Sequence, residues 1–314
     1  MNKGLFLITD TADPMLADGL RQLGFEVHNR PQMSQPELGA VIADYTGLVI
    51  TTKLAVDQEV LQHATRLKYI LRAGSGMEKV DLARAAAMGI RCISSPEGNR
   101  NSVGEHVAAL LLAYYHRIPA SFQEVKQMIW EPYSNRVDEL HGKTLGILGY
   151  GNTGTAVAEK LSAFGLNLLA YDKYRSGYGD SAVKESSLQD LFHAADILSI
   201  HLPYNEETHH MCDAGFFARF KKPLVLVNTS RGKIVHTQHL LDALHQGRLS
   251  AALLDVMENE ALSTFTSAEI NAFQELCRLP QCIITPHIAG KSLQSNKKFA
   301  EILLRKLESA LATD

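Results

Sequence analysis

A glycine-rich turn between a short apolar run and a helix-like stretch constrains this fold more than any other segment. Apolar and β-branched residues at Thr144–Leu148 predict a buried strand, and three glycines follow it at the spacing GxGxxG. Apolar residues three to four positions apart then predict a helix over residues 155–164. Strand, glycine turn and helix in this order are typical of the first βαβ unit of a dinucleotide-binding fold.

Each of the three glycines has its own steric role in such a unit. Gly149 permits the tight turn, Gly151 lets the backbone approach a pyrophosphate, and Gly154 lets the helix pack close to the strand. Phosphates bind at the helix N-terminus, where free N–H groups and the helix dipole favour negative charge. The turn residues that we expect to contact the cofactor are Gly149, Tyr150, Gly151, Asn152, Thr153 and Gly154.

An acidic residue ends the next strand, which is predicted at Asn167–Tyr171. Asp172 lies eighteen residues after Gly154, where a carboxylate accepts hydrogen bonds from the ribose of NAD. The same carboxylate repels a 2′-phosphate, so NAD is the expected cofactor. Lys173, which we also assign to the cofactor site, and Arg175 oppose this preference because either cation can neutralise a phosphate.

Composition predicts a globular protein of two ordinary domains. The chain has 314 residues, 46% of them hydrophobic and 21% charged, and its formal net charge is −3. This balance argues against nucleic acid or an anionic membrane as the main partner. We find no apolar run long enough to span a bilayer, and the start of the chain predicts a strand rather than a secretory leader. The four cysteines form no CxxC motif, so we expect reduced thiols, Cys92 and Cys282 among them in the core, and a cytoplasmic location.

Strand-like and helix-like segments alternate along the chain, which predicts parallel sheets covered on both faces. Strands are expected at residues 5–8, 26–28, 48–50, 69–71 and 91–93, with helices at 15–23, 57–63 and 80–87. A long helix is expected at 102–118, followed by a polar loop at 131–138. After the glycine motif, strands are expected at 197–200, 224–227, 250–254 and 282–284, with helices at 188–193, 214–220 and 237–246.

The glycine motif begins in the middle of the chain, so the dinucleotide unit follows a separate α/β domain. An amphipathic helix predicted at 293–311 is expected to pack back on that first domain. The predicted fold is therefore a Rossmann NAD-binding domain, residues 99–289, inserted into a flavodoxin-like substrate (catalytic) domain, residues 1–98 plus 290–314.

Polar side chains with suitable chemistry follow three apolar strands of the second series. Arg231 follows the run that ends at residue 227, Glu258 and Glu260 follow residue 254, and His287 follows residue 284. Open α/β sheets bind ligands at this carboxyl edge. Histidine can carry the proton that accompanies a hydride transfer, a carboxylate can orient the histidine, and arginine can clamp a substrate carboxylate. Residue chemistry alone leaves both Glu258 and Glu260 open as the partner of His287.

Taken together, these segments resemble the D-2-hydroxyacid dehydrogenase family, which includes phosphoglycerate, glyoxylate/hydroxypyruvate and D-lactate dehydrogenases. The resemblance covers nearly the whole chain. The segments that carry it are residues 72–76 (Arg-Ala-Gly-Ser-Gly), 98–99, 103–106, 142–146, 195–196, 201–203, 207–208, 228–232 and 285–287.

The resemblance implies roles for individual residues. Arg231 is the implied substrate-binding arginine, Glu260 the acid paired with the histidine, and His287 the proton donor and acceptor. The loop implied to hold the substrate carboxylate through backbone N–H groups consists of Arg72, Ala73, Gly74, Ser75 and Gly76. The residues implied to line the cofactor are Val103, His201, Leu202, Pro203, Thr208, Thr229, Ser230, Arg231, Asp255, His287 and Gly290, with Asp255 near the nicotinamide carboxamide.

Two departures from the family pattern lie beside the paired acid. Ala261 replaces the proline that commonly follows it, and residues 262–280 form a longer stretch than usual. Family spacing nevertheless favours Glu260 over Glu258. Formate dehydrogenases usually carry a glutamine here, so a glutamate argues against formate as the substrate.

The sequence favours an enzyme over other classes of protein. The expected function is NAD-dependent hydride transfer to or from a small 2-hydroxy or 2-keto acid, in a homodimer formed through the helix after Ser102. There are two alternatives. One is a non-catalytic NAD-sensing protein, but we see nothing that resembles the interaction tails of such proteins. The other is an S-adenosylmethionine enzyme, whose chemistry has no obvious use for the arginine, the acid and the histidine. His236-x-x-His239 and His209-His210 lack a third zinc ligand, so we expect no metal.

The expected substrate is D-3-phosphoglycerate or its 2-keto form, 3-phosphohydroxypyruvate. A phosphorylated substrate needs cations beyond Arg231, and Lys53, Arg72 and Arg136 are candidates, with Lys53 and Arg72 assigned to the substrate site. Glyoxylate, hydroxypyruvate and D-lactate are the alternatives.

Overall fold

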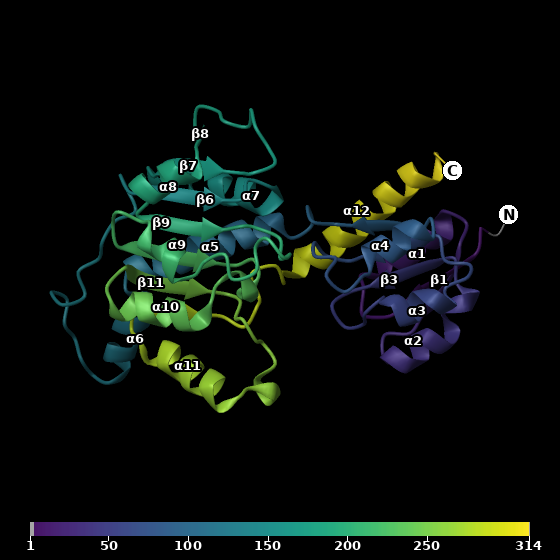
Figure 1. The fold of residues 1–314 in the computed structure, drawn as a ribbon, viewed down its shortest axis with the longest axis horizontal. Coiled ribbons are helices and arrows are strands. Elements are labelled where there is room, and N and C mark those ends of the chain that lie inside the picture. Colours follow the sequence, from purple (N-terminus) through teal and green to yellow (C-terminus); the bar gives the residue numbers. More distant parts are fainter. Residues whose placement is uncertain (1–2, 314) are drawn as a thin grey trace. The chain divides into compact units, whose positions relative to one another are not determined.

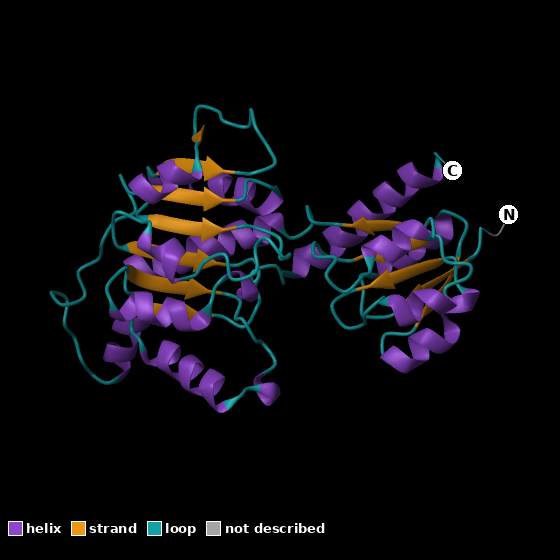
Figure 2. Cartoon of the chain, in the orientation of Figure 1, coloured by secondary structure: helices purple, strands orange, loops and turns teal. Residues whose placement is uncertain are grey.

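The computed structural model describes residues 3–313 and divides them into two compact α/β units (Figures 1 and 2). The first unit runs to Arg100 and resumes at Lys291, and the second spans Asn101–Gly290. The chain therefore leaves the first unit, builds the second, and returns.

The second unit is built on a seven-stranded parallel sheet. Its strands are β6 (Thr144–Leu148), β7 (Asn167–Tyr171), β8 (Val183–Glu185), β9 (Ile197–Ile200), β10 (Leu224–Asn228), β11 (Leu249–Leu254) and β12 (Cys282–Ile284). They lie side by side in the order β12-β11-β10-β9-β6-β7-β8, and the arrows of β7, β6, β9 and β11 point the same way in Figure 2. The order reverses between β6 and β9, which is the switch point where open α/β sheets bind ligands.

Helices cover both faces of this sheet. They are α5 (Arg100–Tyr115), α6 (Ile118–Lys126), α7 (Asn152–Leu161), α8 (Leu188–Ala194), α9 (Ala214–Ala218), α10 (Thr237–His245) and α11 (Ser267–Arg278). Successive strand residues point to opposite faces, so Leu226 joins a core with α8, α9 and α10, whereas Val225 and Val227 join a core with α5 and α7. Both cores are buried, and the sheet between them is a rigid base for the segments at its ends.

The first unit has a five-stranded parallel sheet in the order β2-β1-β3-β4-β5, the flavodoxin-like arrangement. Its strands are β1 (Leu5–Ile8), β2 (Glu26–Asn29), β3 (Gly47–Ile50), β4 (Tyr69–Arg72) and β5 (Arg91–Ser94). Its helices are α1 (Pro14–Gln22), α2 (Gln35–Val41), α3 (Gln58–His63), α4 (Leu82–Ala87) and α12 (Leu293–Leu311). One face packs on α2, α3 and α4, and the other on α1 and α12.

The predicted fold class is confirmed, including the return of the last helix to the first unit. Leu303 and Leu307 of α12 are fully buried against α1 and the sheet. Short 3₁₀ turns complete the chain at Ile42–Asp44, Ser162–Phe164, Gly232–Ile234 and Leu262–Thr264. Among the described residues, none of the helices is long and apolar enough to cross a membrane.

Some predicted elements were misplaced or missed. The helix predicted at 155–164 begins at Asn152, directly after Gly151, and ends in the 3₁₀ turn. The helix predicted at 102–118 ends at Tyr115 because Arg117 adopts a left-handed conformation (φ 52°), after which α6 begins with Pro119 in its first turn. Cys92 and Cys282 are half-buried rather than in the core. The elements α2, α6, α11 and β8 were not predicted. The segments α2 and β8 are short and give weak patterns, whereas α11 carries Ile270, Phe273 and Leu276 at helical spacing, a signal that the prediction missed.

Candidate active site

Most of the predicted site residues of the second unit follow the carboxyl ends of its strands. Because these strands are all parallel, their carboxyl ends lie at one edge of the sheet. The glycine turn follows β6, Asp172 follows β7, His201 follows β9, Thr229 follows β10 and Asp255 follows β11. His287 lies three residues after the end of β12. The fold thus gathers at one edge residues that are far apart in the sequence.

The glycine turn fits a dinucleotide pyrophosphate. Gly149 has φ +95°, a conformation that side chains disfavour, and a Cβ on Gly154 would lie 2.1 Å from the carbonyl oxygen of Gly149. A Cβ on Gly151 would meet no other atom within 4 Å, and this residue caps the N-terminus of α7. Open space beside free helix N–H groups is what a phosphate needs.

Asp172 has a structural contact that the sequence did not reveal. One carboxylate oxygen accepts a hydrogen bond from the main-chain N–H of Tyr150 (2.9 Å), and the other accepts one from the N–H of Tyr174 (2.9 Å). The acid therefore ties the end of β7 to the glycine turn. Each oxygen keeps a further lone pair for a ribose hydroxyl.

Three residues that follow β9 and β10 differ in whether their side chains have hydrogen-bond partners. The ring of His201 is buried and bonded through Nε2 to the Ser199 hydroxyl (2.8 Å), and burial lowers its pKa to about 3. Ser230 is bonded to the Asn228 side chain (2.9 Å). The hydroxyl of Thr229 is buried and has no hydrogen-bond partner among the described residues, so it fits a role in holding a cofactor.

The remaining residues predicted to bind the cofactor differ in their burial and in their contacts. Val103 is buried on α5, and the hydroxyl of Thr208 donates to the carbonyl of Pro203 (2.8 Å), within the loop itself. Leu202 packs against the Gly149 turn, and Gly290 is the last residue of the second unit. These residues shape or anchor the loops, whereas Lys173 is held by an ion pair with Glu207.

The predicted acid–histidine pair is present at the same edge. His287 Nδ1 donates a hydrogen bond to Glu260 Oε2 across 2.8 Å, and both side chains are about two-fifths exposed. Burial alone would raise the pKa of Glu260, but the hydrogen bond and charge of His287, with further help from Arg231, lower it. Of the two acids that residue chemistry left open, Glu260 is therefore the one in contact with His287.

Asp255 fixes the segment that carries His287. Its carboxylate accepts hydrogen bonds from the Thr285 hydroxyl (2.5 Å) and from the main-chain N–H groups of Ile288 (2.9 Å) and Ala289 (2.7 Å). Its carbonyl accepts from the N–H of His287 (2.8 Å), whose backbone has a φ of 55°. This left-handed conformation is costly for histidine and needs such support.

Arg231 follows β10 in extended conformation and is half-buried. It donates one hydrogen bond to the carbonyl of Ser230 (2.8 Å), and its charge contributes to the lowered pKa of Glu260. The arginine, the acid and the histidine are thus electrostatically linked.

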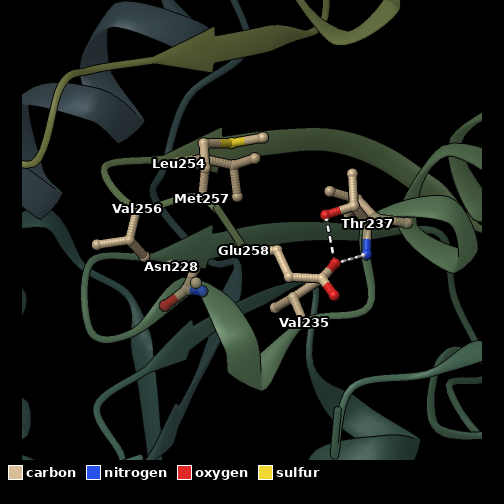
Figure 3. A pocket seen from close by; sticks show the side chains of 9 residues that line it. Asn228, Val235, Thr237, Leu254, Val256, Met257 and Glu258 are labelled. Atoms are coloured by element: carbon tan, nitrogen blue, oxygen red, sulfur yellow. Dashed lines mark hydrogen bonds between the residues drawn. The ribbon is translucent and has the colours of Figure 1, made fainter. Parts of the chain in front are cut away.

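Glu258 has a separate structural function. It accepts hydrogen bonds from the main-chain N–H (3.0 Å) and hydroxyl (2.7 Å) of Thr237 at the start of α10. Both residues line a small pocket whose other side chains, apart from that of Asn228, are apolar (Figure 3). His210 contacts its other oxygen (2.7 Å). The ring of His209 stacks on that of His210, the ring of His236 stacks on that of His239, and the two pairs meet through a tilted contact between His210 and His236. Within residues 3–313, no group of three or more histidine, cysteine or acidic side chains is arranged to hold a metal.

The substrate residues predicted in the first unit follow β3 and β4. Arg72 is buried, with its guanidinium donating to the carbonyl of Ala73, and Gly74 has φ +141°. Lys53 is exposed and donates to the carbonyl of Pro31 (2.6 Å), and Arg136 donates to the carbonyl of Tyr133 (3.2 Å). Among these cations, Arg72 alone combines burial with a place in the predicted loop of residues 72–76.

These features define a Rossmann-type dinucleotide-binding protein with an acid–histidine pair at its ligand-binding edge. The model of the NAD binding domain of the D-isomer specific 2-hydroxyacid dehydrogenases matches residues 108–289. The chain belongs to this family, as its sequence predicted, and NAD is the cofactor of the matching domain.

Relatives and solved structures agree with this assignment. The chain is 33% identical over 299 residues to D-3-phosphoglycerate dehydrogenase of Archaeoglobus fulgidus, covering 95% of this chain and 55% of that protein. It is 31% identical to hydroxypyruvate reductase of Thermotoga maritima, over 88% of each. D-lactate dehydrogenase of Aquifex aeolicus, solved with NAD and lactic acid, has 26% identity and a TM-score of 0.83 over 99% of this chain and 97% of that one. The chain spans about half the length of the phosphoglycerate dehydrogenases that it matches.

Proposed function

We propose that the protein is an NAD-dependent dehydrogenase that transfers a hydride between NAD(H) and a small 2-hydroxy or 2-keto acid. The observation that carries this proposal is the 2.8 Å hydrogen bond between Glu260 and His287, at the edge of the sheet that holds the glycine turn. A histidine oriented by a carboxylate is suited to proton transfer near neutral pH. We place the protein in the cytoplasm, as expected from its cysteines.

The proposed chemistry assigns one task to each of three residues. When bound, NAD(H) supplies or accepts the hydride. Because Nδ1 of His287 is bonded to Glu260, Nε2 gives a proton to the carbonyl oxygen during reduction and takes it back during oxidation. Glu260 stabilises the protonated ring, and Arg231 binds the substrate carboxylate through its planar guanidinium.

The proposed substrate is D-3-phosphoglycerate, with 3-phosphohydroxypyruvate as its 2-keto form. Support comes from the names of several relatives and from Arg72, a buried cation in the segment assigned to the substrate carboxylate. Lys53 and Arg136 give less support to a phosphorylated substrate, because each donates a hydrogen bond to a backbone carbonyl on an exposed part of its unit. Hydroxypyruvate is the second candidate, favoured by the relative from Thermotoga maritima, which this chain matches over 88% of its length.

A direct comparison of substrates tests this proposal. We expect purified protein to oxidise NADH with 3-phosphohydroxypyruvate more efficiently than with hydroxypyruvate, glyoxylate or pyruvate. Arg72→Ala should reduce kcat/KM for the phosphorylated acid far more than for hydroxypyruvate. Equal efficiencies that Arg72→Ala leaves unchanged would contradict the phosphate assignment, and no turnover with any of the acids would contradict the dehydrogenase assignment.

We also propose that the protein forms a homodimer. The sequence pointed to the long helix after Ser102, but the apolar residues of α5 are largely buried in the core of their own unit. A better candidate is the exposed apolar set on α6 and the loop after it: Ile118, Phe122, Val125, Met128, Ile129, Trp130, Tyr133 and Val137. Analytical ultracentrifugation of the double variant Phe122→Asp with Trp130→Asp tests this interface, because the two new charges should leave the protein monomeric. Leu262→Asp, at an exposed apolar site elsewhere, is the control and should not change the mass. A double variant that is still a dimer would contradict the proposed interface.

A further inference from the structure

Both cations that follow Asp172 are held by other groups of the second unit. The ammonium of Lys173 forms an ion pair with Glu207, and the guanidinium of Arg175 donates to the carbonyl of Tyr150. The hydroxyl of Tyr174 donates to the second oxygen of Glu207 (2.5 Å). A single carboxylate therefore holds two consecutive side chains of the segment after β7.

The position of Glu207 is fixed by the loop that carries it. The main-chain N–H of Thr208 donates to the Asn205 side chain (3.0 Å), and the N–H of Asn205 donates to the Thr208 hydroxyl (2.9 Å). That hydroxyl also donates to the carbonyl of Pro203 (2.8 Å), and Thr208 is buried. These reciprocal hydrogen bonds make a rigid turn, so Glu207 is presented toward Lys173 rather than left on a mobile loop.

The topology places this contact beside the adenosine end of the cofactor site. In the sheet, β6 lies between β9 and β7, so the loops after β9 and β7 flank the glycine turn that follows β6. Glu207 belongs to the first of these loops, and Lys173 and Tyr174 belong to the second. The ribose that Asp172 is expected to bind carries the 2′-oxygen that is phosphorylated in NADP. A phosphate at that oxygen needs a nearby cation to offset the charge of Asp172.

We propose that Glu207 is a specificity-determining residue for the dinucleotide, because it holds the ammonium of Lys173 away from the position of a 2′-phosphate. Discrimination against NADP(H) is then shared between Asp172 and a residue on another loop. This inference rests on the dinucleotide-binding part of the proposed function, and it holds whichever 2-hydroxy acid is the substrate.

The charges of the contact agree with this role. The hydrogen bond with Glu207 raises the pKa of Lys173, and the hydrogen bonds from Lys173 and Tyr174 lower the pKa of Glu207, so both partners are charged at neutral pH. The side chains of Lys173 and Glu207 are 55% and 44% exposed. Solvent screens such a pair, so we expect the effect on nucleotide affinity to be modest, roughly threefold to tenfold, and to shrink as salt rises.

Equilibrium binding of NADH and NADPH, followed by nucleotide fluorescence, tests the proposal without any substrate. Glu207→Gln should lower the Kd for NADPH about threefold to tenfold and change the Kd for NADH less than about twofold. Glu206→Gln, at the exposed neighbour in the same turn, should leave both values unchanged. In the double variant Glu207→Gln with Lys173→Met, the gain for NADPH should disappear, because the freed cation is its source.

Several results would overturn the proposal. One is a ratio of the two Kd values that Glu207→Gln leaves unchanged. Another is an equal loss of affinity for NADH and NADPH, which would indicate a purely structural role. A third is a gain in NADPH affinity that persists when Lys173 is also replaced. Wild-type protein that binds neither nucleotide would overturn it together with the cofactor assignment. Tight NADH binding without turnover of any 2-keto acid would contradict only the dehydrogenase activity.

Discussion

His287 donates a hydrogen bond from Nδ1 to Glu260 Oε2 across 2.8 Å, which leaves Nε2 as the ring nitrogen that the acid does not engage. The main-chain N–H of the same histidine is bonded to the carbonyl of Asp255, which holds its left-handed backbone. The residue is therefore fixed both at one ring nitrogen and at its backbone. Under the proposed function, Nε2 is therefore the atom that exchanges a proton with the substrate oxygen.

Replacing Glu260 should change the pH dependence of the reaction. A neutral amide in Glu260→Gln no longer stabilises the protonated form of His287, and keto-acid reduction needs that form. The alkaline limb of the pH–rate profile should therefore move to lower pH. His287→Ala removes the proton donor and should lower kcat by about 10²- to 10⁴-fold.

Glu258→Gln is the matched control, because this acid belongs to the same loop but contacts Thr237 and His210. It should lower the melting temperature and leave the pH–rate profile in place. A shifted profile in Glu258→Gln, with an unshifted one in Glu260→Gln, would contradict the assignment of the paired acid.

Two glycines of the same turn should respond differently to alanine. In Gly154→Ala the new Cβ would lie 2.1 Å from the carbonyl oxygen of Gly149, so the turn must shift and the protein should lose stability. In Gly151→Ala the Cβ meets no protein atom within 4 Å, so the fold should lose no more than about 1 kcal/mol from the weaker helix cap. The methyl group would nevertheless occupy the space that we assign to the pyrophosphate, so it should weaken NADH binding.

Melting temperature and the Kd for NADH, measured on both glycine variants, check this pair of expectations. A Gly151→Ala protein that binds NADH as the wild type does would show that the phosphates lie elsewhere.

Buried His201 should make the protein sensitive to mild acid. Its pKa is lowered to about 3 by burial, whereas the unfolded chain binds the same proton near 6.5. Well above pH 6.5 the ring is neutral in both states, so it has no effect on the free energy of unfolding. As pH falls from 6.5 toward 3, only the unfolded state gains the proton, so between pH 7 and 5 the free energy of unfolding should fall by about 2 kcal/mol.

Urea unfolding followed by circular dichroism at several pH values measures this loss. In the His201→Asn variant, the free energy of unfolding should change less between pH 7 and 5, whatever its absolute value. An equal pH dependence in the two proteins would assign the acid sensitivity to other groups.

The sequence predicted the parts of this molecule that rest on local patterns. The strands other than β8, the glycine turn and the helix at Leu293–Leu311 follow from hydrophobic periodicity and from glycine spacing. The pairing of Glu260 with His287 followed from the family resemblance, because Glu258 offers the same carboxylate two residues away. The structure separates the two acids by what they contact.

Other contacts had no local signal. Glu207 and Lys173 are 34 residues apart, and neither differs in pattern from an ordinary surface charge. The bond from Tyr150 to Asp172 depends on how the glycine turn approaches β7, which spacing alone does not determine. Contacts between exposed polar side chains on different loops need coordinates, because burial does not constrain them.

The transfer of a hydride to the 2-keto carbon is the central claim, and deuterium labelling tests it most directly. We would incubate the protein with NADH deuterated at C4 of the nicotinamide, on whichever face is transferred, and with 3-phosphohydroxypyruvate or hydroxypyruvate. The product should be the D-2-hydroxy acid with one deuterium at C2, detected by NMR and chiral chromatography, and His287→Ala should form it far more slowly. A product without deuterium at C2, or one of L configuration, would contradict the account.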